Sequence, residues 1–157
     1  MQQESRLVVV DASVVLKWQL NDEEYIDQVM ALRDDFYLYR VIGAIAPQLL
    51  AYEVVNGMVI ATRQNRATAD DAIEGVNNLS ALGIELREIK PLRILELSLK
   101  YRLAAYDAAY LILAEDEKCD LWTADRAFYQ AVKKESRHVN WIGDYRTRAM
   151  HIDHRSQ

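Results

Sequence analysis

The chain has few of the residues that interrupt regular structure or tie it together covalently. Among its 157 residues there are two prolines, five glycines and one cysteine, Cys119. So few prolines and glycines predict helices and strands joined by short loops. A lone cysteine excludes a disulfide within the chain and is typical of a reducing compartment. We therefore expect a fold that depends on its hydrophobic core.

The sequence also lacks the features of membrane and exported proteins. No apolar run approaches the roughly 18 residues that cross a bilayer. The first residues, Met1 to Ser5, lack the basic start of a signal peptide. These absences predict a cytoplasmic protein without a membrane anchor.

A broad basic surface is missing too, because the net charge is −5 at pH 7. The acidic excess lies in the first part of the chain, and basic side chains outnumber acidic ones only from residue 118 onward. This balance argues against a general nucleic-acid coat protein, which needs a basic footprint. It does not exclude an enzyme that holds nucleic acid locally through metal ions.

Short apolar segments separated by helical patterns dominate what is present. The segments 7–11, 42–46, 84–87, 120–123 and 139–142 predict β-strands. Strands that alternate with helices are typical of an α/β domain with a mostly parallel sheet and helices on both faces. We predict one three-layer domain over residues 1–157. Its core is expected at about 7–143, followed by a polar, loosely held tail at 144–157.

The helical segments predict which faces are buried. Residues 48–63 are apolar nearly all round, which indicates a fully buried helix. The helix that starts at Thr68 is expected to bury its apolar face and to end at Gly83. Asn21 with Glu24, and Thr68 with Asp71, have the spacing of capping boxes. The aromatic residues expected in the core are Trp18, Tyr52, Tyr106, Tyr110, Trp122 and Trp141.

Four acidic residues stand inside or beside apolar sequence, where an unpaired charge is costly. Asp11 and Asp125 each follow a predicted strand, so a parallel sheet would bring both to one edge. Asp107 opens an apolar helical run. Glu53 lies in the middle of the 48–63 helix, with no cation one turn away in either direction.

These acids predict a metal site. Carboxylates gathered at one sheet edge repel one another unless a divalent cation neutralises them. An all-oxygen ligand set favours Mg²⁺ or Mn²⁺ over zinc, and such ions clamp phosphate oxygens and activate water. Ser13 and Thr123 lie two residues after Asp11 and two before Asp125, where hydroxyls can orient carboxylates or water.

Each of these residues also has an interpretation without chemistry. Asp11, Asp107 and Asp125 stand where a helix N-cap is expected. Glu53 could pair with an arginine from elsewhere in the chain. Ser13 and Thr123, taken singly, are ordinary structural hydroxyls. These acids and hydroxyls therefore indicate a site only when they are taken together.

Four blocks of sequence carry a family resemblance. They are VVVDASVVLKW, APQLLAYEVVNGM, LAAYDAAYLILAE and LWTADRAF, and they span nearly everything from Val8 to Ile142. In this order and spacing they resemble the PIN-domain ribonucleases, and most of all the VapC-type toxins of toxin–antitoxin pairs. The resemblance places the family's acidic site and its common hydroxyl on Asp11, Glu53, Asp107, Asp125 and Thr123. One departure is Phe128, where some members carry a further acid.

The resemblance implies an Mg²⁺- or Mn²⁺-dependent endoribonuclease that acts on RNA. It also implies a homodimer and a small antitoxin protein as partner. Two other interpretations stay open. Haloacid-dehalogenase-like phosphatases also place an aspartate after the first strand, but their second aspartate is Ser13 here. A non-catalytic binding module of the same fold would be expected to lose one or more of the acids, and all four are present.

Overall fold

The computed structural model describes residues 6–20 and 24–149, whose strands form a single parallel sheet. The strand order is β3-β2-β1-β4-β5. The strands are β1 (Arg6–Val10), β2 (Ile42–Pro47), β3 (Glu85–Arg87), β4 (Asp120–Thr123) and β5 (Val139–Trp141). The predicted parallel sheet is confirmed. Each strand begins and ends within one residue of its predicted segment; for example, β2 includes Pro47 and β5 ends before Ile142.

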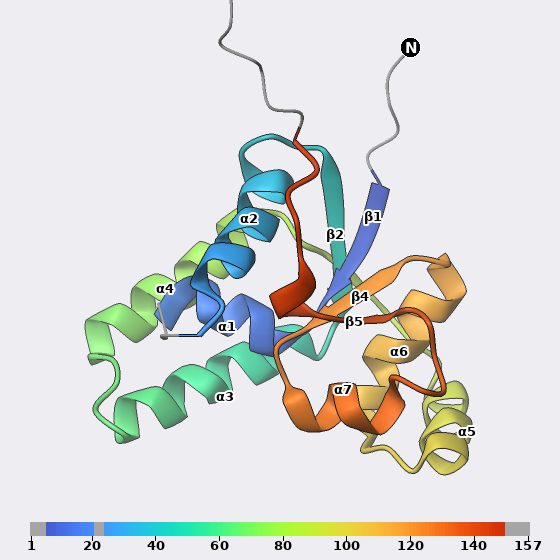
Figure 1. Cartoon of the computed structure of the whole chain (residues 1–157). Helices are drawn as coiled ribbons and strands as arrows, with labels where there is room; N and C mark the ends of the chain where they lie inside the picture. Colours follow the sequence, from blue (N-terminus) through green and yellow to red (C-terminus); the bar gives the residue numbers. More distant parts are fainter. Residues whose placement is uncertain (1–5, 21–23, 150–157) are drawn as a thin grey trace, which may run out of the picture.

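Helices cover both faces of this sheet, which confirms the predicted three-layer α/β class (Figure 1). The helices between the first three strands are α1 (Ala12–Leu20), α2 (Ile26–Tyr37), α3 (Leu50–Arg63) and α4 (Ala69–Leu82). Those that follow are α5 (Pro91–Tyr101), α6 (Ala105–Glu117) and α7 (Arg126–Val132), with a 3₁₀ helix, η1 (Ile142–Asp144), after β5. Within the described residues, no helix is long and apolar enough to cross a membrane.

The central strand β1 sets the position of the candidate site. From β1 the chain moves outward through β2 to β3, then returns to β4 on the opposite side of β1 and continues to β5. The strand order therefore reverses between β1 and β4, where Val10 pairs with Trp122. In open parallel sheets the crevice beyond the carboxyl ends of the strands at such a reversal is where ligands bind. Val8, Val9 and Val10 are fully buried, as a strand covered on both faces requires.

The prediction that the helix at 48–63 is buried all round is wrong. Only one stripe of α3 is buried, formed by Leu50, Val54, Met58 and Ala61. Tyr52, predicted in the core, is 82 % exposed. The reason is that α3 packs mainly on α1 and α4 and not on the face of the sheet, so its far side has nothing to pack against.

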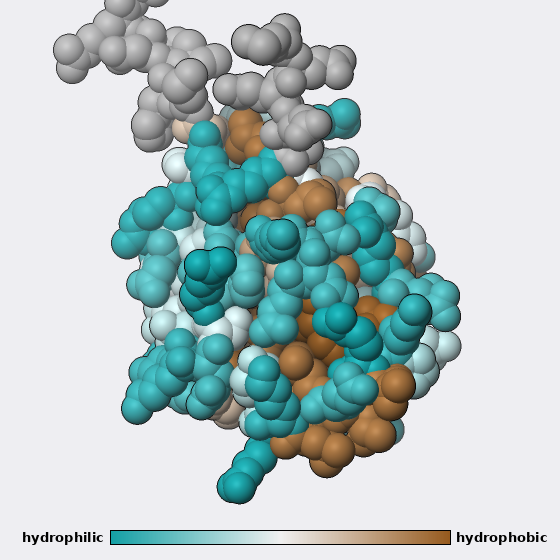
Figure 2. Space-filling view, turned by 90° about the vertical axis from the view of Figure 1, so that its right-hand side faces the viewer, coloured by the Kyte–Doolittle hydropathy of each residue, from teal (hydrophilic) through white to brown (hydrophobic). Residues whose placement is uncertain are grey.

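Two other helices also leave apolar side chains in solvent. The helix α4 buries only Gly75, and Ile73, predicted to be buried, is 60 % exposed. On α5, a row of three leucines is exposed, formed by Leu92, Leu95 and Leu99. Figure 2 draws the side of the molecule that faces right in Figure 1. Hydrophobic side chains gather near the lower end of this side, at the level of α5 in Figure 1. Exposed apolar surface of this kind marks a place where another molecule binds.

The helix ends follow the predicted capping signals in part. Thr68 and Asp71 form the reciprocal capping box of α4, and Gly83 ends that helix with a φ of +80° that favours glycine. The proposed Asn21–Glu24 box lies partly outside the described residues. The helix α2 instead begins after Tyr25, which has a left-handed backbone (φ 60°) and no side-chain cap.

The prediction of a loosely held tail from residue 144 is wrong for its described part. Asp35 of α2 is fully buried and accepts three hydrogen bonds from the tail. The donors are the Tyr145 hydroxyl (2.6 Å), the Thr147 hydroxyl (2.7 Å) and the Arg148 backbone N–H (2.7 Å). The Tyr145 ring also packs edge-on against Trp122. The core therefore extends beyond residue 143.

Replacing Asp35 with asparagine is expected to lower the free energy of unfolding by about 2 kcal/mol. One acceptor oxygen becomes an amide donor that faces the donors of the tail, which leaves buried polar groups without partners. Asp34→Asn is the matched control, because Asp34 is partly exposed and, among the described residues, its side chain bonds only Arg33. Its effect should stay within about 0.5 kcal/mol. Urea denaturation measures both, and equal losses would contradict the role given to Asp35.

Candidate functional site

Asp11 directly follows the central strand and is 6 % exposed. Its Oδ1 accepts hydrogen bonds from the backbone N–H of Ser13 (3.0 Å) and of Val14 (3.3 Å), and from the Ser13 hydroxyl. Bonds to the second and third residues of α1 are those of an N-cap, so Asp11 caps that helix. They also fix the direction of its carboxylate at the point where the strand order reverses.

Two hydroxyls connect the ends of β1 and β4. The Ser13 hydroxyl lies 3.4 Å from that of Thr123, which is fully buried. The Ser13 oxygen accepts the Ala124 N–H (2.9 Å), and the Thr123 oxygen accepts the Asp125 N–H (3.0 Å). The residues predicted as orienting hydroxyls therefore lie beside the predicted acids and hold the backbone that carries Asp125.

Asp125 is the N-cap of α7, and its charge also affects the other three predicted acids. Its carboxylate accepts the N–H of Phe128 at 3.1 Å, so the capping interpretation is confirmed. Its charge also acts on Asp11, Glu53 and Asp107, raising the pKa of each. These effects place Asp125 within electrostatic range of the other three predicted acids.

The other two acids lie in the first turns of helices. Glu53 is in the first turn of α3, so the prediction that it sits in the middle of that helix is wrong. Asp107 is in the first turn of α6 and is not its N-cap, because that position belongs to Ala104. The reason for both positions is the same: these helices begin beyond the carboxyl ends of strands, and a carboxylate in the first turn is favoured by the helix dipole.

Burial and mutual repulsion raise the pKa values at this site. Burial raises the pKa of Asp11 to about 7, against the hydrogen bonds from Ser13, Thr123 and Val14 that favour its charged form. The pKa of Glu53 is raised by burial and then by the charges of Asp107 and Asp125, and that of Asp107 by burial and by Asp125. The ionised carboxylates therefore destabilise one another until a cation is present.

Sequence reasoning placed Tyr110 in the core and missed its second role. The Tyr110 side chain is buried on α6, and its hydroxyl donates a hydrogen bond to Glu53 at 2.8 Å. The signal was available, because Tyr110 follows Asp107 by three residues and so shares its face of the helix. Tyr110 thus orients Glu53 from the same helix that carries Asp107.

The donor set suits a hard divalent cation. Within the described part of the chain, none of the four acids forms an ion pair with a basic side chain. The available donors are carboxylate and hydroxyl oxygens, which favour Mg²⁺ or Mn²⁺. No three His, Cys, Asp or Glu side chains among the described residues are placed to hold one ion as they stand.

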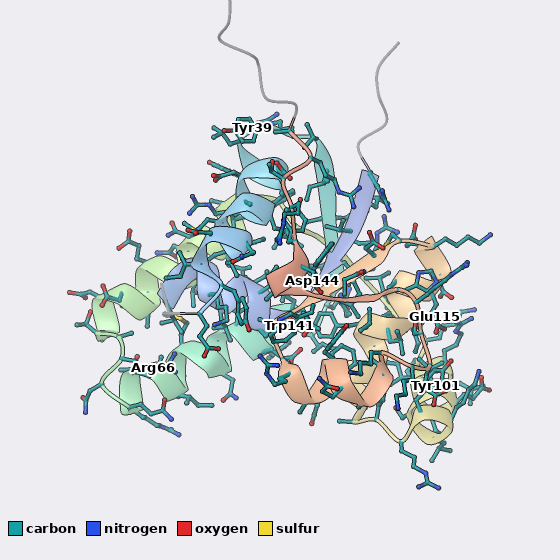
Figure 3. All side chains as sticks on the ribbon, in the orientation of Figure 1. Tyr39, Arg66, Tyr101, Glu115, Trp141 and Asp144 are labelled. Atoms are coloured by element: carbon teal, nitrogen blue, oxygen red, sulfur yellow. The ribbon has the colours of Figure 1, made fainter. Side chains whose placement is uncertain are left out.

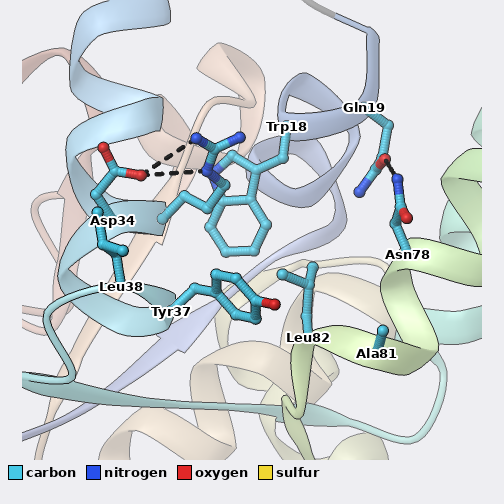
Figure 4. Close-up of a pocket in the computed structure, with 9 residues that line it drawn as sticks. Trp18, Gln19, Asp34, Tyr37, Leu38, Asn78, Ala81 and Leu82 are labelled. Carbon is cyan, nitrogen blue, oxygen red and sulfur yellow. Dashed lines mark hydrogen bonds and ion pairs between the residues drawn. The ribbon is translucent and has the colours of Figure 1, made fainter.

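A separate pocket of about 430 Å³ lies between α1, α2 and α4 (Figure 4). Four of its polar side chains already bond one another: Arg33 donates to Asp34, and Asn78 donates to Gln19 at 3.5 Å. Trp18 also lines it. Among its lining residues there is one acid and no nucleophile, so the acidic cluster is the better candidate for chemistry.

Comparison with known proteins gives the family. A profile of the PIN domain matches residues 8–134. The chain belongs to the PIN-domain family. It is 31 % identical over 121 residues to the VapC ribonuclease Mb0985 of Mycobacterium bovis, a match that covers 76 % of this chain and 86 % of that protein. Ribonuclease VapC9 of Mycobacterium tuberculosis matches to the same extent.

The fold of this PIN-domain chain also has a solved counterpart. The crystal structure of PAE2754 from Pyrobaculum aerophilum superposes with a TM-score of 0.64 and 19 % sequence identity. The match covers 88 % of this chain and 90 % of that one. The predicted family resemblance and fold are confirmed. All four acids and Thr123 fall within residues 8–134, and their role as a metal site stays a prediction.

The raised pKa of Asp11 makes the stability of the metal-free protein depend on pH. The carboxyl titrates near 3.8 when unfolded and near 7 when folded, so the folded state binds more protons between these values. Its stabilising contribution is full below about pH 4 and is lost as the pH rises through about 7. Asp11→Asn carries no titrating proton. It is expected to melt several degrees above the parent at pH 8 in EDTA, and close to it near pH 4.

Thermal unfolding between pH 4 and pH 8 tests this expectation. Asp116→Asn is the control, because Asp116 is an exposed acid of α6 paired with Arg93. Its melting curve should follow that of the parent at each pH. An Asp11→Asn protein whose stability fell with pH as steeply as the parent's would contradict the effect assigned to Asp11.

Proposed function

We propose that the protein is an endoribonuclease that depends on Mg²⁺ or Mn²⁺. The observation that carries the proposal is a cluster of four acids, unpaired by basic side chains in the described part of the chain, at the reversal point of a PIN-type sheet. The named relatives are VapC ribonucleases, which supports RNA as the substrate. The acids proposed to hold the metal are Asp11, Glu53, Asp107 and Asp125.

The chain's own groups have distinct tasks in this proposal. A bound divalent ion would clamp phosphate oxygens and lower the pKa of its water. The N–H groups of Ser13 and Val14 keep the Asp11 carboxylate oriented, and the buried Thr123 hydroxyl supports it from β4. Tyr110 keeps Glu53 in place. Such support matters because a catalytic constellation tolerates displacements of only about 0.5 Å.

Neither alternative interpretation has similar support. A haloacid-dehalogenase-like phosphatase needs a second acid where Ser13 stands, and the Ser13 hydroxyl is already engaged with Asp11 and Ala124. A non-catalytic module would gain nothing from gathering one buried, two half-buried and one exposed carboxylate whose mutual repulsion destabilises the fold. Retention of all four acids in that setting favours an active metal site.

The resemblance to VapC-type toxins, together with relatives named VapC ribonucleases, supports a role as the toxin of a toxin–antitoxin pair, with a small antitoxin protein as partner and the cytoplasm as its place of action. An apolar groove of about 540 Å³ between α3 and α4 offers a surface for a partner. Its lining includes Val55, Met58, Val59, Ile73 and Val76.

We place the second copy of a homodimer on α5. Leu92, Leu95 and Leu99 recur at helical spacing and are exposed. Glu96 and Lys100 flank this leucine row with opposite charges. An antiparallel arrangement sets Glu96 of one copy near Lys100 of the other, so the surface complements itself as a two-fold interface requires.

Replacing Asp107 with asparagine is expected to reduce metal-dependent RNA cleavage by at least about a hundredfold, because a ligand charge is lost while the shape is kept. The matched control is Asp116→Asn on the same helix, which should cleave at the parental rate. Cleavage of a labelled single-stranded RNA is followed with Mg²⁺, with Mn²⁺ and with EDTA. Undiminished cleavage by a folded Asp107→Asn protein would refute the metal site.

Introducing charge into the leucine row should separate the proposed dimer. Leu95→Glu places a carboxylate in the centre of an apolar interface, where its desolvation is costly. Light scattering after size exclusion should report half the mass of the parent. Ile73→Glu, at an equally exposed apolar position on α4, should leave the dimer intact. A parental dimer that persists in Leu95→Glu would place the interface elsewhere.

A further inference from the structure

One cluster beside the acids has no part in the metal site described above. Arg126, the residue after Asp125, lies with its guanidinium carbon 4.7 Å from the centre of the Trp141 ring. Its Nη2 donates a hydrogen bond to the Tyr25 hydroxyl at 3.1 Å. The Tyr25 ring in turn meets Trp141 edge-on, with ring centres 5.3 Å apart. We call Arg126, Trp141 and Tyr25 the cation–aromatic cluster.

The fold holds this cluster at the edge of the sheet where the acids lie. Trp141 is the last residue of β5 and pairs in register with Thr123 of β4, whose hydroxyl stands beside Asp11. Figure 3 labels Trp141 at this edge, near the start of α7. Arg126 is the first residue of α7, directly after the acid that caps it. The cluster therefore adjoins the acidic site in two ways: β5 pairs with the strand that carries Thr123, and α7 begins directly after Asp125.

The cluster is rigid as well as close. A side chain at position 143 would come within 2.8 Å of both Trp141 Nε1 and Tyr25 Cε1, so Gly143 allows the two rings to approach. Tyr25 has a left-handed backbone with φ of 60°, an uncommon and strained conformation for a bulky residue. Strained backbone of this kind persists where neighbouring groups hold it, and it gathers at binding sites.

The charge of Arg126 is available for a ligand. Its side chain is exposed and forms no ion pair with an acid in the part of the chain that the structure describes. A guanidinium spread over an aromatic ring keeps its outer N–H donors free, and their planar fork suits phosphate oxygens. In a chain with net charge −5, such a cation beside the acids is where an anionic strand can be held.

We propose that the cation–aromatic cluster is a nucleotide subsite that holds the RNA strand next to the acidic site. Arg126 binds a backbone phosphate beside the scissile one, and the partly exposed ring of Trp141 stacks a neighbouring base. Tyr25 fixes the guanidinium through its hydroxyl. This inference rests on the proposed nuclease function and adds the contact that positions its substrate.

RNA binding without cleavage tests the subsite. A fluorescent single-stranded RNA is titrated with the Asp11→Asn protein in EDTA, and anisotropy is measured at several salt concentrations. Adding Arg126→Ala should weaken binding about tenfold and reduce the salt slope by about one. Arg126→Lys should restore the slope but only part of the affinity, because lysine keeps the charge and loses the planar fork. Lys134→Ala, an exposed basic residue just beyond α7, should change neither quantity by as much.

The outcomes separate this inference from the nuclease proposal. If the parental chain cleaves RNA and Arg126→Ala binds with the parental affinity and slope, the subsite is refuted and the nuclease proposal stands. If Arg126→Ala loses binding while the parental chain shows no metal-dependent cleavage, the subsite stands and the nuclease proposal fails. If Lys134→Ala weakens binding as much as Arg126→Ala, binding is diffuse and the subsite is refuted. Circular dichroism of each variant confirms that it is folded.

Discussion

The burial and mutual repulsion of carboxylates near the end of β1 are the main electrostatic cost at this site, and the surrounding groups offset it. Burial raises the pKa values of Asp11, Glu53 and Asp107, and the charge of Asp125 raises all three further. A fold that only needed helix caps would not place these charges together. A bound divalent cation would offset these charges, which is why we propose that the acids form one metal site.

The surrounding structure holds the acids in place while they repel one another. Helices that start beyond the carboxyl ends of the strands direct their N-termini toward the site, which stabilises negative charge. The hydroxyls of Ser13 and Thr123 tie the β1 and β4 ends together, and Tyr110 restrains Glu53. At the margin of the site, Arg126 supplies the opposite charge on a ring system that Gly143 allows to pack closely. The acids proposed to hold a metal and the cation proposed to hold the RNA strand then lie side by side.

Local patterns predicted most of the fold and the proximity of Asp11, Thr123 and Asp125 at the ends of two neighbouring strands. The valines of β1 and the aspartate after them placed Asp11 at a strand end, and parallel pairing then brought Thr123 and Asp125 to it. Most of the failures concern what packs against a helix, which a local pattern does not contain. The apolar residues of α3 and the leucines of α5 have the spacing of buried faces, yet Tyr52 and Leu95 are exposed. The local sequence around Asp35 does not indicate burial, because the residues that cover and bond its carboxylate are Tyr145, Thr147 and Arg148, more than 100 positions later.

Calorimetric titration with Mn²⁺ tests the central claim most directly. Because burial raises the pKa of Asp11 to about 7, metal binding near pH 6.5 must displace protons from this carboxyl. A metal site formed by the four acids predicts a saturable binding heat that changes with the ionisation enthalpy of the buffer. This heat should disappear in Asp107→Asn and persist in Asp116→Asn. The absence of a saturable heat with the folded parental protein, or binding that survives unchanged in Asp107→Asn, would contradict it.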